Sequence, residues 1–331
     1  MRKPLLALTV NVIAIISILF WLALQSSPAS EMTRLRNALL FSVGTMGDFT
    51  WTPSQVPPDF QQEKTIVPKN IIQFQPAHEA TGSQWQTTLT TIDRLRENTR
   101  FGRAIQSNTE QALSLIINEG RGYCADYTQV INALSYHNKV FAREWGMSFD
   151  GYGGWGHAFS EFYIQEWQKW VFVDVYNGFY IQHKGSDQPL SVLEFRQLLA
   201  NAPQEIEVIR TLGKFGFKDD QALVNYYLRG VDQFYLWWAN DSLSYDEHPV
   251  ILWAAQFGRP VEQLVAIIIG VHPKIKALPL AMNELMRAKM YRLKIKLLSA
   301  VVILSLLGLF SGYLLILLNK RRKILKKTGQ V

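Results

Sequence analysis

The chain is predicted to fold as an α+β protein, in which a helix packs on an antiparallel sheet, with helical extensions and two flanking transmembrane helices. Three observations predict this. A helical pattern follows Cys124, two aromatic strands begin near His157 and Trp170, and an apolar segment long enough to cross a bilayer lies near each end. About 270 residues lie between the two apolar segments, which is enough for one core and leaves room for a second.

The first apolar segment runs from Leu5 to Leu24 and follows Arg2 and Lys3. A helix of about 20 residues is about 30 Å long, which matches the hydrocarbon core of a bilayer. A signal peptide cleaved within residues 26–30 is the alternative, but its apolar region would normally run only about 7–15 residues. An uncleaved N-terminal transmembrane anchor over residues 1–28 is therefore predicted.

Residues 29–78 are predicted to form an extended extracytoplasmic linker. The stretch Trp51–Asp59 contains three prolines, which favour extended chain. Residues 79–190 are predicted to form the core of the soluble part. Within that core, Gln84–Asn98 and Gln106–Asn118 have helical composition and are expected to pack before the helix that begins at Cys124.

Cys124 is the only cysteine of the chain and lies in the run Gly120–Tyr127. Two glycines of this run end any preceding helix and allow a tight turn. Apolar residues then recur at the spacing of a buried helix face up to about Tyr136. A thiol at a helix N-terminus lies where backbone N–H groups and the helix dipole favour the thiolate, which is the nucleophilic form. A small buried hydrophobic cysteine is the alternative.

His157 lies at the start of a segment that alternates like a strand, and Asp174 ends the next strand. A short polar turn between them predicts a hairpin, whose open ends bring His157 and Asp174 together. An imidazole acts as base and acid near neutral pH, and a carboxylate on its second nitrogen fixes the tautomer. Glu161 shares a strand face with His157 and is the alternative orienting carboxylate, although a role in supporting the fold is favoured.

The stretch 120–177 resembles the core of the transglutaminase-like superfamily of papain-fold enzymes. The motifs that carry the resemblance are Gly122-Tyr123-Cys124, His157-Ala158-Phe159-Ser160-Glu161 and Trp170-Val171-Phe172-Val173-Asp174. It implies a papain-like catalytic core with a Cys124-His157-Asp174 triad and a thioester formed on Cys124. The resembling stretch covers about a fifth of the chain. Its motifs leave open whether water or an amine accepts the acyl group.

The glycine-rich loop Gly151–Gly156 ends at His157. It is either a lid over a substrate cleft or a plain connection between strands. The candidate substrate-binding residues are Tyr123, Tyr152 and Trp155. No metal site and no cofactor are predicted, because His248 and His272 lack ligand spacing to other histidines or to the cysteine.

Residues 191–296 are predicted to form a helical, aromatic-rich extension. Three helices are expected, over Ser191–Leu199, Ala222–Ala239 and Pro260–Val271. The aromatic residues between Tyr226 and Trp238 are expected to fill the core, with sugar stacking or a place at the membrane interface as alternatives. The last of the three helices is too short to span a bilayer, which indicates a buried or interface-lying helix.

The second apolar segment, Leu297–Leu318, has 22 residues without a charge, and a basic tail follows over residues 319–331. Basic flanks at both ends predict cytoplasmic termini and a domain outside the cytoplasm. Five basic residues within Arg287–Lys296 weaken the charge bias across this helix. Gly308 and Gly312 form a small-xxx-small pattern, which could pair with another membrane protein.

The net charge is +7, from 34 basic and 27 acidic residues, and eight of the basic residues lie in the two terminal flanks. The remainder is close to neutral, so the basicity marks a membrane boundary and nucleic acid is not an expected partner. One cysteine cannot form an internal disulfide. A single thiol kept in an oxidising compartment favours a chemical role.

These features favour a cell-membrane, two-span cysteine enzyme. Its extracytoplasmic domain would transfer or hydrolyse acyl groups at amide bonds of cell-envelope peptides or proteins. A protease that cuts one regulated partner differs from this only in substrate. The alternative is a non-catalytic accessory or scaffold subunit of a membrane complex, for example in surface-polymer export, with the domain as a binding platform.

Overall fold

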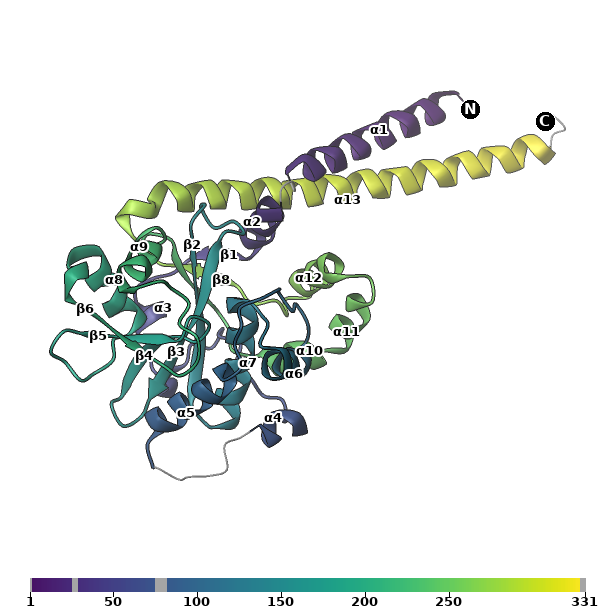
Figure 1. Ribbon diagram of the computed structural model, residues 1–331. Coiled ribbons are helices and arrows are strands. Elements are labelled where there is room, and N and C mark those ends of the chain that lie inside the picture. The colour runs from purple at the N-terminus through teal and green to yellow at the C-terminus, as the bar shows by residue number, and fades with distance from the viewer. Residues whose placement is uncertain (1, 26–28, 75–81, 328–331) are drawn as a thin grey trace.

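The computed structural model describes residues 2–25, 29–74 and 82–327, and its centre is one eight-stranded sheet (Figure 1). The strand order is β1-β8-β7-β2-β3-β4-β5-β6. The strands are β1 (Phe41–Val43), β2 (Phe141–Ser148), β3 (Gly156–Ile164), β4 (Lys169–Asp174), β5 (Phe179–His183), β6 (Ile206–Arg210), β7 (Phe234–Trp237) and β8 (Ile275–Ala277). All neighbours pair antiparallel except β1 and β8, which are parallel. The α+β class is confirmed, and the sheet is mixed instead of purely antiparallel.

Helices cover both faces of this sheet. One face carries α4 (Lys69–Gln73), α5 (Gln84–Arg96), α6 (Thr109–Glu119) and α7 (Cys124–His137), and the other carries α3 (Gly47–Thr50), α8 (Val192–Asn201) and α9 (Asp220–Leu228). Side chains of the central strands alternate between the two cores. Phe159 and Phe172 pack with α8 and α9, whereas Phe162 and Val173 pack with α7. The helices predicted at 84–98, 106–118, 124–136 and 191–199 are therefore present.

The predicted hairpin is formed by β3 and β4, with Ser160 opposite Val173. β2 lies on the other side of β3 and places Met147 opposite His157. Alternating apolar and aromatic residues let each strand bury both of its faces between helices. His157 is the second residue of β3 and Asp174 is the last residue of β4. Because these strands are antiparallel, both residues lie at the same end of the hairpin.

The segment 29–78 differs from the extended linker that the prolines indicated. Within its described part, α2 (Ala29–Leu40), β1, α3, the 3-10 turn η1 (Pro53–Gln55) and α4 pack onto the domain. Phe49, Trp51 and Phe60 are at most 6% exposed. The prolines mark turns between short elements, and the burial of aromatic side chains between these turns fixes the segment to the core.

The segment 191–296 is only partly helical. Besides α8 and α9 it contains the elements η2 (Pro203–Glu205), α10 (Ser242–Glu247), α11 (Pro249–Ala255), α12 (Arg259–Ile268) and η3 (Ala281–Asn283), and it supplies strands β6, β7 and β8. The helix expected over Ala222–Ala239 is wrong in its second half, where Phe234–Trp237 forms β7. Aromatic side chains and alternating burial suit a strand that pairs with β2 on one side and β8 on the other. Tyr227, Phe234 and Trp238 are at most 1% exposed, as the core-filling interpretation requires.

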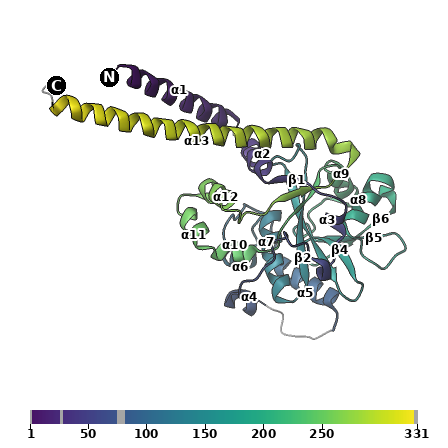
Figure 2. The same cartoon turned by 180° about the vertical axis from the view of Figure 1, so that it is seen from behind.

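Two stretches, Pro4–Leu24 and Ala281–Lys323, are long and apolar enough to cross a membrane, judged by length and composition. They belong to α1 (Arg2–Gln25) and α13 (Glu284–Lys327), which lie side by side and extend away from the domain together (Figures 1 and 2). The start of α13 instead packs on the domain, where Lys294 Nζ donates to the Phe41 carbonyl at 2.8 Å. The cleavage region suggested at 26–30 lies largely outside the described residues.

A polar contact joins α1 to α13 in the middle of the apolar segments. Asn11 Nδ2 donates to the Leu307 carbonyl at 2.7 Å and to Ser311 Oγ at 2.6 Å. A Cβ placed at Gly308 or Gly312 would meet no described atom within 4 Å. These two glycines therefore do not pair α1 with α13, and their pairing with another membrane protein stays a prediction.

Candidate active site

Cys124 is the first residue of α7 and is partly exposed. The turn before it requires glycine, because Gly120 ends α6 at φ 66° and Gly122 adopts φ 135°. A Cβ at Gly120 would also lie 1.8 Å from the Asn98 carbonyl oxygen. The unpaired N–H groups of a first helical turn and the helix dipole favour an anion at this position. The local fold thus presents the thiol at the place predicted from the sequence.

Asp126 fixes the start of α7 and was not among the predicted site residues. Its carboxylate accepts from the backbone N–H groups of Tyr123 at 2.7 Å, Ile105 at 3.0 Å and Gln106 at 3.1 Å. The chain that approaches α7 is thereby bound to the helix two residues after Cys124. An acidic residue at the third position of a helix is the sequence signal for such a cap.

His157 and Asp174 meet as the hairpin predicted. His157 Nε2 lies 2.8 Å from Asp174 Oδ2, and the residues are 5% and 0% exposed. Asn177 Nδ2 also donates to Asp174 Oδ2 at 2.7 Å, and it lies 3.2 Å from His157 Nε2. The Tyr227 hydroxyl donates to the same carboxylate oxygen at 2.7 Å. Sequence reasoning missed both: Asn177 had a signal in its turn position after Asp174, whereas Tyr227 comes from α9, 53 residues away in the chain.

The charges of this cluster are strongly coupled. Burial opposes a charged imidazole, but the charges of Asp174, Tyr226 and Cys124 outweigh it and raise the pKa of His157 well above its ordinary value. Burial likewise opposes ionisation of Asp174, yet the imidazole and its hydrogen bond lower the pKa of that carboxyl. The two directions agree and describe an imidazolium–carboxylate pair. Burial and then the Asp174 charge raise the pKa of Tyr227 well above its ordinary value, which keeps its hydroxyl as a donor.

Cys124 and His157 interact through their charges, since Cys124 is one of the causes that raise the pKa of His157. Among the described residues, no hydrogen bond joins the thiol to the imidazole. Asp174 and Asn177 both lie against Nε2. Nδ1 is therefore the ring nitrogen left to exchange a proton with the thiol.

A buried arginine lies behind the carboxylate of the pair. Arg96 is 0% exposed, and its guanidinium donates to Thr211 Oγ1 at 2.8 Å and to the Leu212 carbonyl. Burial lowers its pKa, and the charge of Asp174 acts in the opposite direction. Gly178 leaves the space that the guanidinium occupies, because a Cβ there would lie about 2 Å from it. Arg96, the last residue of α5, thus adds a second positive charge near Asp174. No local sequence pattern of α5 indicates this role.

Glu161 does not compete with Asp174 for the histidine. Its carboxylate accepts from Arg143 Nε and Trp145 Nε1, both at 2.7 Å, and from the Val192 N–H at 2.8 Å. The glutamate and Arg143 are almost completely buried. Glu161 therefore joins β2, β3 and the start of α8, which is the fold-supporting role favoured from the sequence.

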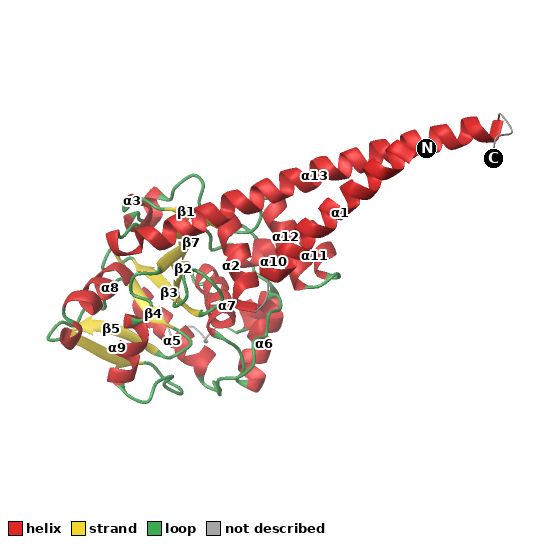
Figure 3. Cartoon of the chain, turned by 90° about the horizontal axis from the view of Figure 1, so that it is seen from above, coloured by secondary structure: helices red, strands yellow, loops and turns green. Residues whose placement is uncertain are grey.

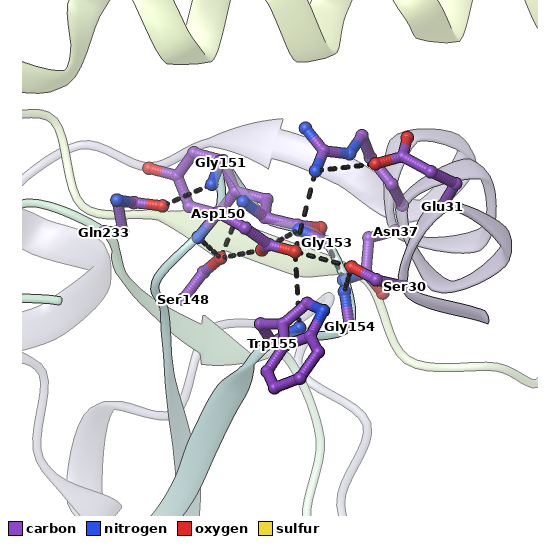
Figure 4. A network of polar contacts seen from close by, with 12 residues as sticks. Ser30, Glu31, Asn37, Ser148, Asp150, Gly151, Gly153, Gly154, Trp155 and Gln233 are labelled. Atoms are coloured by element: carbon purple, nitrogen blue, oxygen red, sulfur yellow. Dashed lines mark hydrogen bonds and ion pairs between the residues drawn. The ribbon is translucent and has the colours of Figure 1, made fainter. Parts of the chain in front are cut away.

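The glycine-rich loop is fixed to the helix that follows the first apolar segment (Figure 4). Asp150 accepts from Ser30 Oγ at 2.5 Å, and the Gly154 N–H donates to Ser30 Oγ at 3.0 Å. Asn37 Nδ2 donates to the Tyr152 carbonyl at 2.8 Å. Because several hydrogen bonds fix it to α2, the loop is a rigid connection between β2 and β3. The alternative of a lid over the cleft is not supported by this arrangement.

The three predicted substrate-binding residues lie in different surroundings. Tyr152 is 1% exposed and packs against Phe41, with 5.1 Å between the ring centroids. The prediction that Tyr152 contacts a substrate is therefore wrong. Its backbone at φ 66° turns the ring inward, a conformation that sequence reasoning did not foresee. Tyr123 and Trp155 are 51% and 67% exposed and precede Cys124 and His157 by one and two residues. Both remain candidates for substrate contact.

A polar cavity of about 180 Å³ opens beside the first turns of α7. Its lining includes Ala125 and Asn132 of α7, Glu144 of β2, Arg36 of α2 and Arg259 of α12. Asn132 is 3% exposed, and its Oδ1 has no hydrogen-bond partner among the described residues. Burial raises the pKa of Glu144 to about 8, although Arg36 acts against it. The cavity begins one residue after the thiol and offers charges of both signs.

No group of three or more His, Cys, Asp or Glu side chains is arranged to hold a metal ion within the described ranges. Comparisons with protein-family models, with curated proteins and with solved structures gave no match to this chain. The resemblance to a known family therefore rests on the order and spacing of the three motifs alone. The site's chemistry follows from its geometry: a thiol at a helix N-terminus beside a buried imidazolium–carboxylate pair.

Proposed function

We propose that the protein is a membrane-anchored cysteine enzyme of the transglutaminase-like kind, which acts on amide or peptide bonds through a thioester. The carrying observation is the buried contact of 2.8 Å between His157 Nε2 and Asp174 Oδ2, coupled by charge to a partly exposed Cys124 at the start of α7. A nucleophile, a base and an orienting acid in this order are the components of nucleophilic acyl transfer.

The proposed reaction has two steps. The Cys124 thiolate attacks the carbonyl carbon, and His157 donates a proton to the leaving nitrogen as the C–N bond breaks, which leaves a thioester on Cys124. Water or an amine then attacks the thioester and gives its proton to His157, and the C–S bond breaks to restore the thiolate. Backbone N–H groups of the first turn of α7 are suited to stabilise the oxyanion.

The proposed substrate is a peptide or protein of the cell envelope. Exposed Tyr123 and Trp155 flank the thiol and imidazole. The neighbouring cavity offers Arg36 for an acidic substrate group and Glu144 for a hydrogen bond. We place the domain outside the cytoplasm and both chain ends inside it, because basic residues flank both apolar segments at the chain ends. Two of the basic residues before the second segment, Arg287 and Lys294, bind domain carbonyl groups.

A non-catalytic accessory subunit is the second candidate. The observation that favours it is the lack of a hydrogen bond between Cys124 and His157 in the described residues. In that function the domain would serve as a binding platform of a membrane complex. Replacement of Cys124 by alanine would then leave the function of the complex unchanged.

The test is the pH dependence of iodoacetamide labelling of the full chain in lipid nanodiscs. Cys124 is the only cysteine, so every label reports on it. We expect labelling at about pH 6 to slow by roughly tenfold or more in His157→Ala, because the thiolate then loses its imidazolium partner. Tyr163→Phe, a change on the same strand away from the site, is the control. Labelling of Cys124 that is equally fast in His157→Ala and in the wild type would reject the enzyme hypothesis and favour the accessory-subunit hypothesis.

A further inference from the structure

A pair of short helices exposes an apolar surface on the domain. The pair, α11 and α12, turns at Gly258, where φ is 95°. We name this unit the α11–α12 hairpin. Its exposed large apolar side chains are Val250, Leu252, Trp253, Phe257, Val261, Leu264, Ile268 and Ile269. Ile268 is 73% exposed and Phe257 is 61% exposed. This many exposed large apolar side chains on one small unit mark an interaction surface.

One face of α12 packs on the protein with Glu262, Ala266 and Ile267, and its other face exposes large apolar side chains. Glu262 is 6% exposed and accepts from the Tyr245 hydroxyl at 3.0 Å, while it also pairs with Arg259. Val261, Leu264 and Ile268 recur at three and four residues on the outer face. This is the reverse of the pattern of a helix at a water-facing surface. The outer face of α12 therefore suits an apolar environment.

The hairpin lies at the level where both apolar helices leave the domain. Ile267 of α12 packs in the same apolar cluster as Leu22 of α1 and Leu297 of α13. Leu22 lies near the end of the first apolar segment, and Leu297 begins the second. Figures 1 to 3 show α11 and α12 on the side of the domain from which α1 and α13 extend. The apolar face of the hairpin thus continues the apolar surface of the two helices.

We propose that the α11–α12 hairpin is a third membrane contact, which inserts its apolar face into the leaflet nearest the domain. The occupant is the lipid bilayer, because the hairpin packs with the domain-proximal ends of the two apolar segments. The hairpin also carries an exposed tryptophan, Trp253, a residue type that is enriched at membrane interfaces. Burying eight large apolar side chains in lipid removes the cost of leaving them in water. The proposal is independent of the chemistry at Cys124.

This contact has a consequence for the cavity beside α7. Arg259 and Gln263 of α12 belong to the cavity lining, so the hairpin forms one of its walls. A hairpin seated in the leaflet holds that wall at the membrane surface. The cavity would then receive groups that approach along the bilayer and not from the distant solution.

The test is a spin-label accessibility measurement on the full chain in lipid nanodiscs. A Cys124→Ser background leaves no other thiol, and the label is placed by Leu264→Cys on the hairpin. Leu309→Cys, at a 74% exposed position of α13, is the lipid reference. Leu212→Cys, at a 67% exposed position after β6 on the far edge of the sheet, is the water reference.

We expect the Leu264→Cys label to be relaxed more by oxygen than by a nickel chelate, as the Leu309→Cys label is, and the Leu212→Cys label to show the reverse. A nickel-dominated Leu264→Cys label would overturn the proposal, since the patch would then face water. A label reached by neither reagent would also overturn it, because protein would then cover the patch. If Leu309→Cys itself is nickel-dominated, α13 does not span the bilayer and the proposal fails with it.

Discussion

The Oδ2 atom of Asp174 accepts from three side chains that reach it from β3, from the turn after β4 and from α9. They are His157 at 2.8 Å, Asn177 at 2.7 Å and Tyr227 at 2.7 Å. A buried carboxylate is stable only when it is paired and hydrogen-bonded in this way. The same bonds hold the imidazole in one orientation, with its Nδ1 atom left for the thiol.

Asp174→Asn is expected to lower stability by about 3–5 kcal/mol, because it removes one charge of a buried pair. The loss depends on pH. The raised pKa of His157 stabilises the fold fully below the ordinary value of 6.5, and this contribution is lost as the pH rises through the folded value. The lowered pKa of Asp174 stabilises the fold above 3.8 and is lost as the pH falls through its folded value.

The difference in unfolding free energy between wild type and Asp174→Asn should therefore be largest between about pH 4 and 6.5 and shrink at alkaline pH. Urea unfolding followed by tryptophan fluorescence, in nanodiscs across this range, measures it. Tyr227→Phe keeps both charges and should cost about 1–2 kcal/mol with little pH dependence. A pH-independent loss in Asp174→Asn would mean that the pair is not ionised.

The sequence predicted the positions of the thiol, the imidazole and the carboxylate well, and the residues that support them poorly. Cys124, His157 and Asp174 could be placed because one helix start and one hairpin, both local patterns, position them. Tyr227 and Arg96 could not, since they reach the site from distant elements through tertiary packing. Tyr152 was placed wrongly because its positive φ turns the ring into the core, which no local pattern of a glycine-rich loop indicates.

Glu161 and Arg143 show how a buried ion pair organises whole elements. The glutamate binds side chains of β2 and the first N–H of α8, and Arg143 also donates to the Phe49 carbonyl of α3 at 2.7 Å. The guanidinium lies 3.9 Å from the ring centre of Trp170. Five elements, α3, β2, β3, β4 and α8, thus meet at one pair of charges.

Glu161→Ala is expected to destabilise the protein by about 3–5 kcal/mol, because it leaves the Arg143 cation buried without its counter-charge. Trp145 Nε1 and the Val192 N–H would also lose their acceptor. The comparison is Arg210→Ala, which breaks an exposed pair with Asp220 and should cost less than about 1 kcal/mol. Urea unfolding of both variants measures the difference, and equal losses would contradict this account.

Among the elements, long periodic helices and the aromatic hairpin followed from the sequence, whereas short strands did not. β1 and β8 have three residues each, too few to show alternation, and they are defined by pairing with each other. The prolines between α2 and α4 predict extended chain. The aromatic side chains of this segment are buried through contacts with β2 and β4, which only the tertiary structure reveals.

For the molecule as a whole, the two apolar helices form one unit instead of two separate anchors. Asn11 is 5% exposed and makes the polar contact between them. In an apolar environment its amide has no water to bind, so the bonds to α13 fix how the helices pair.

Asn11→Leu is expected to weaken the pairing of α1 and α13 by about 0.6–1.7 kcal/mol. The measurement is the rate of oxidative cross-linking between Ala7→Cys and Phe310→Cys, which line the same space between the helices, in a Cys124→Ser background. The Asn11→Leu change should slow it. Thr9→Val removes a hydroxyl that bonds only within α1 and should leave the rate unchanged. Equal rates in all three proteins would show that Asn11 does not hold the pair.

The hydrogen bonds between α2 and the glycine-rich loop connect the first apolar helix mechanically to the strand that carries His157. α2 begins four residues after α1 ends, and Ser30 at its start binds Asp150 and Gly154, just before the strand that begins with Gly156 and His157. A helix longer or shorter than the local hydrocarbon thickness changes its tilt. If α1 spans a bilayer, as we propose, a change in its tilt pulls on the chain that leads into β3, and bilayer thickness becomes a variable in the alignment of the imidazole with the thiol.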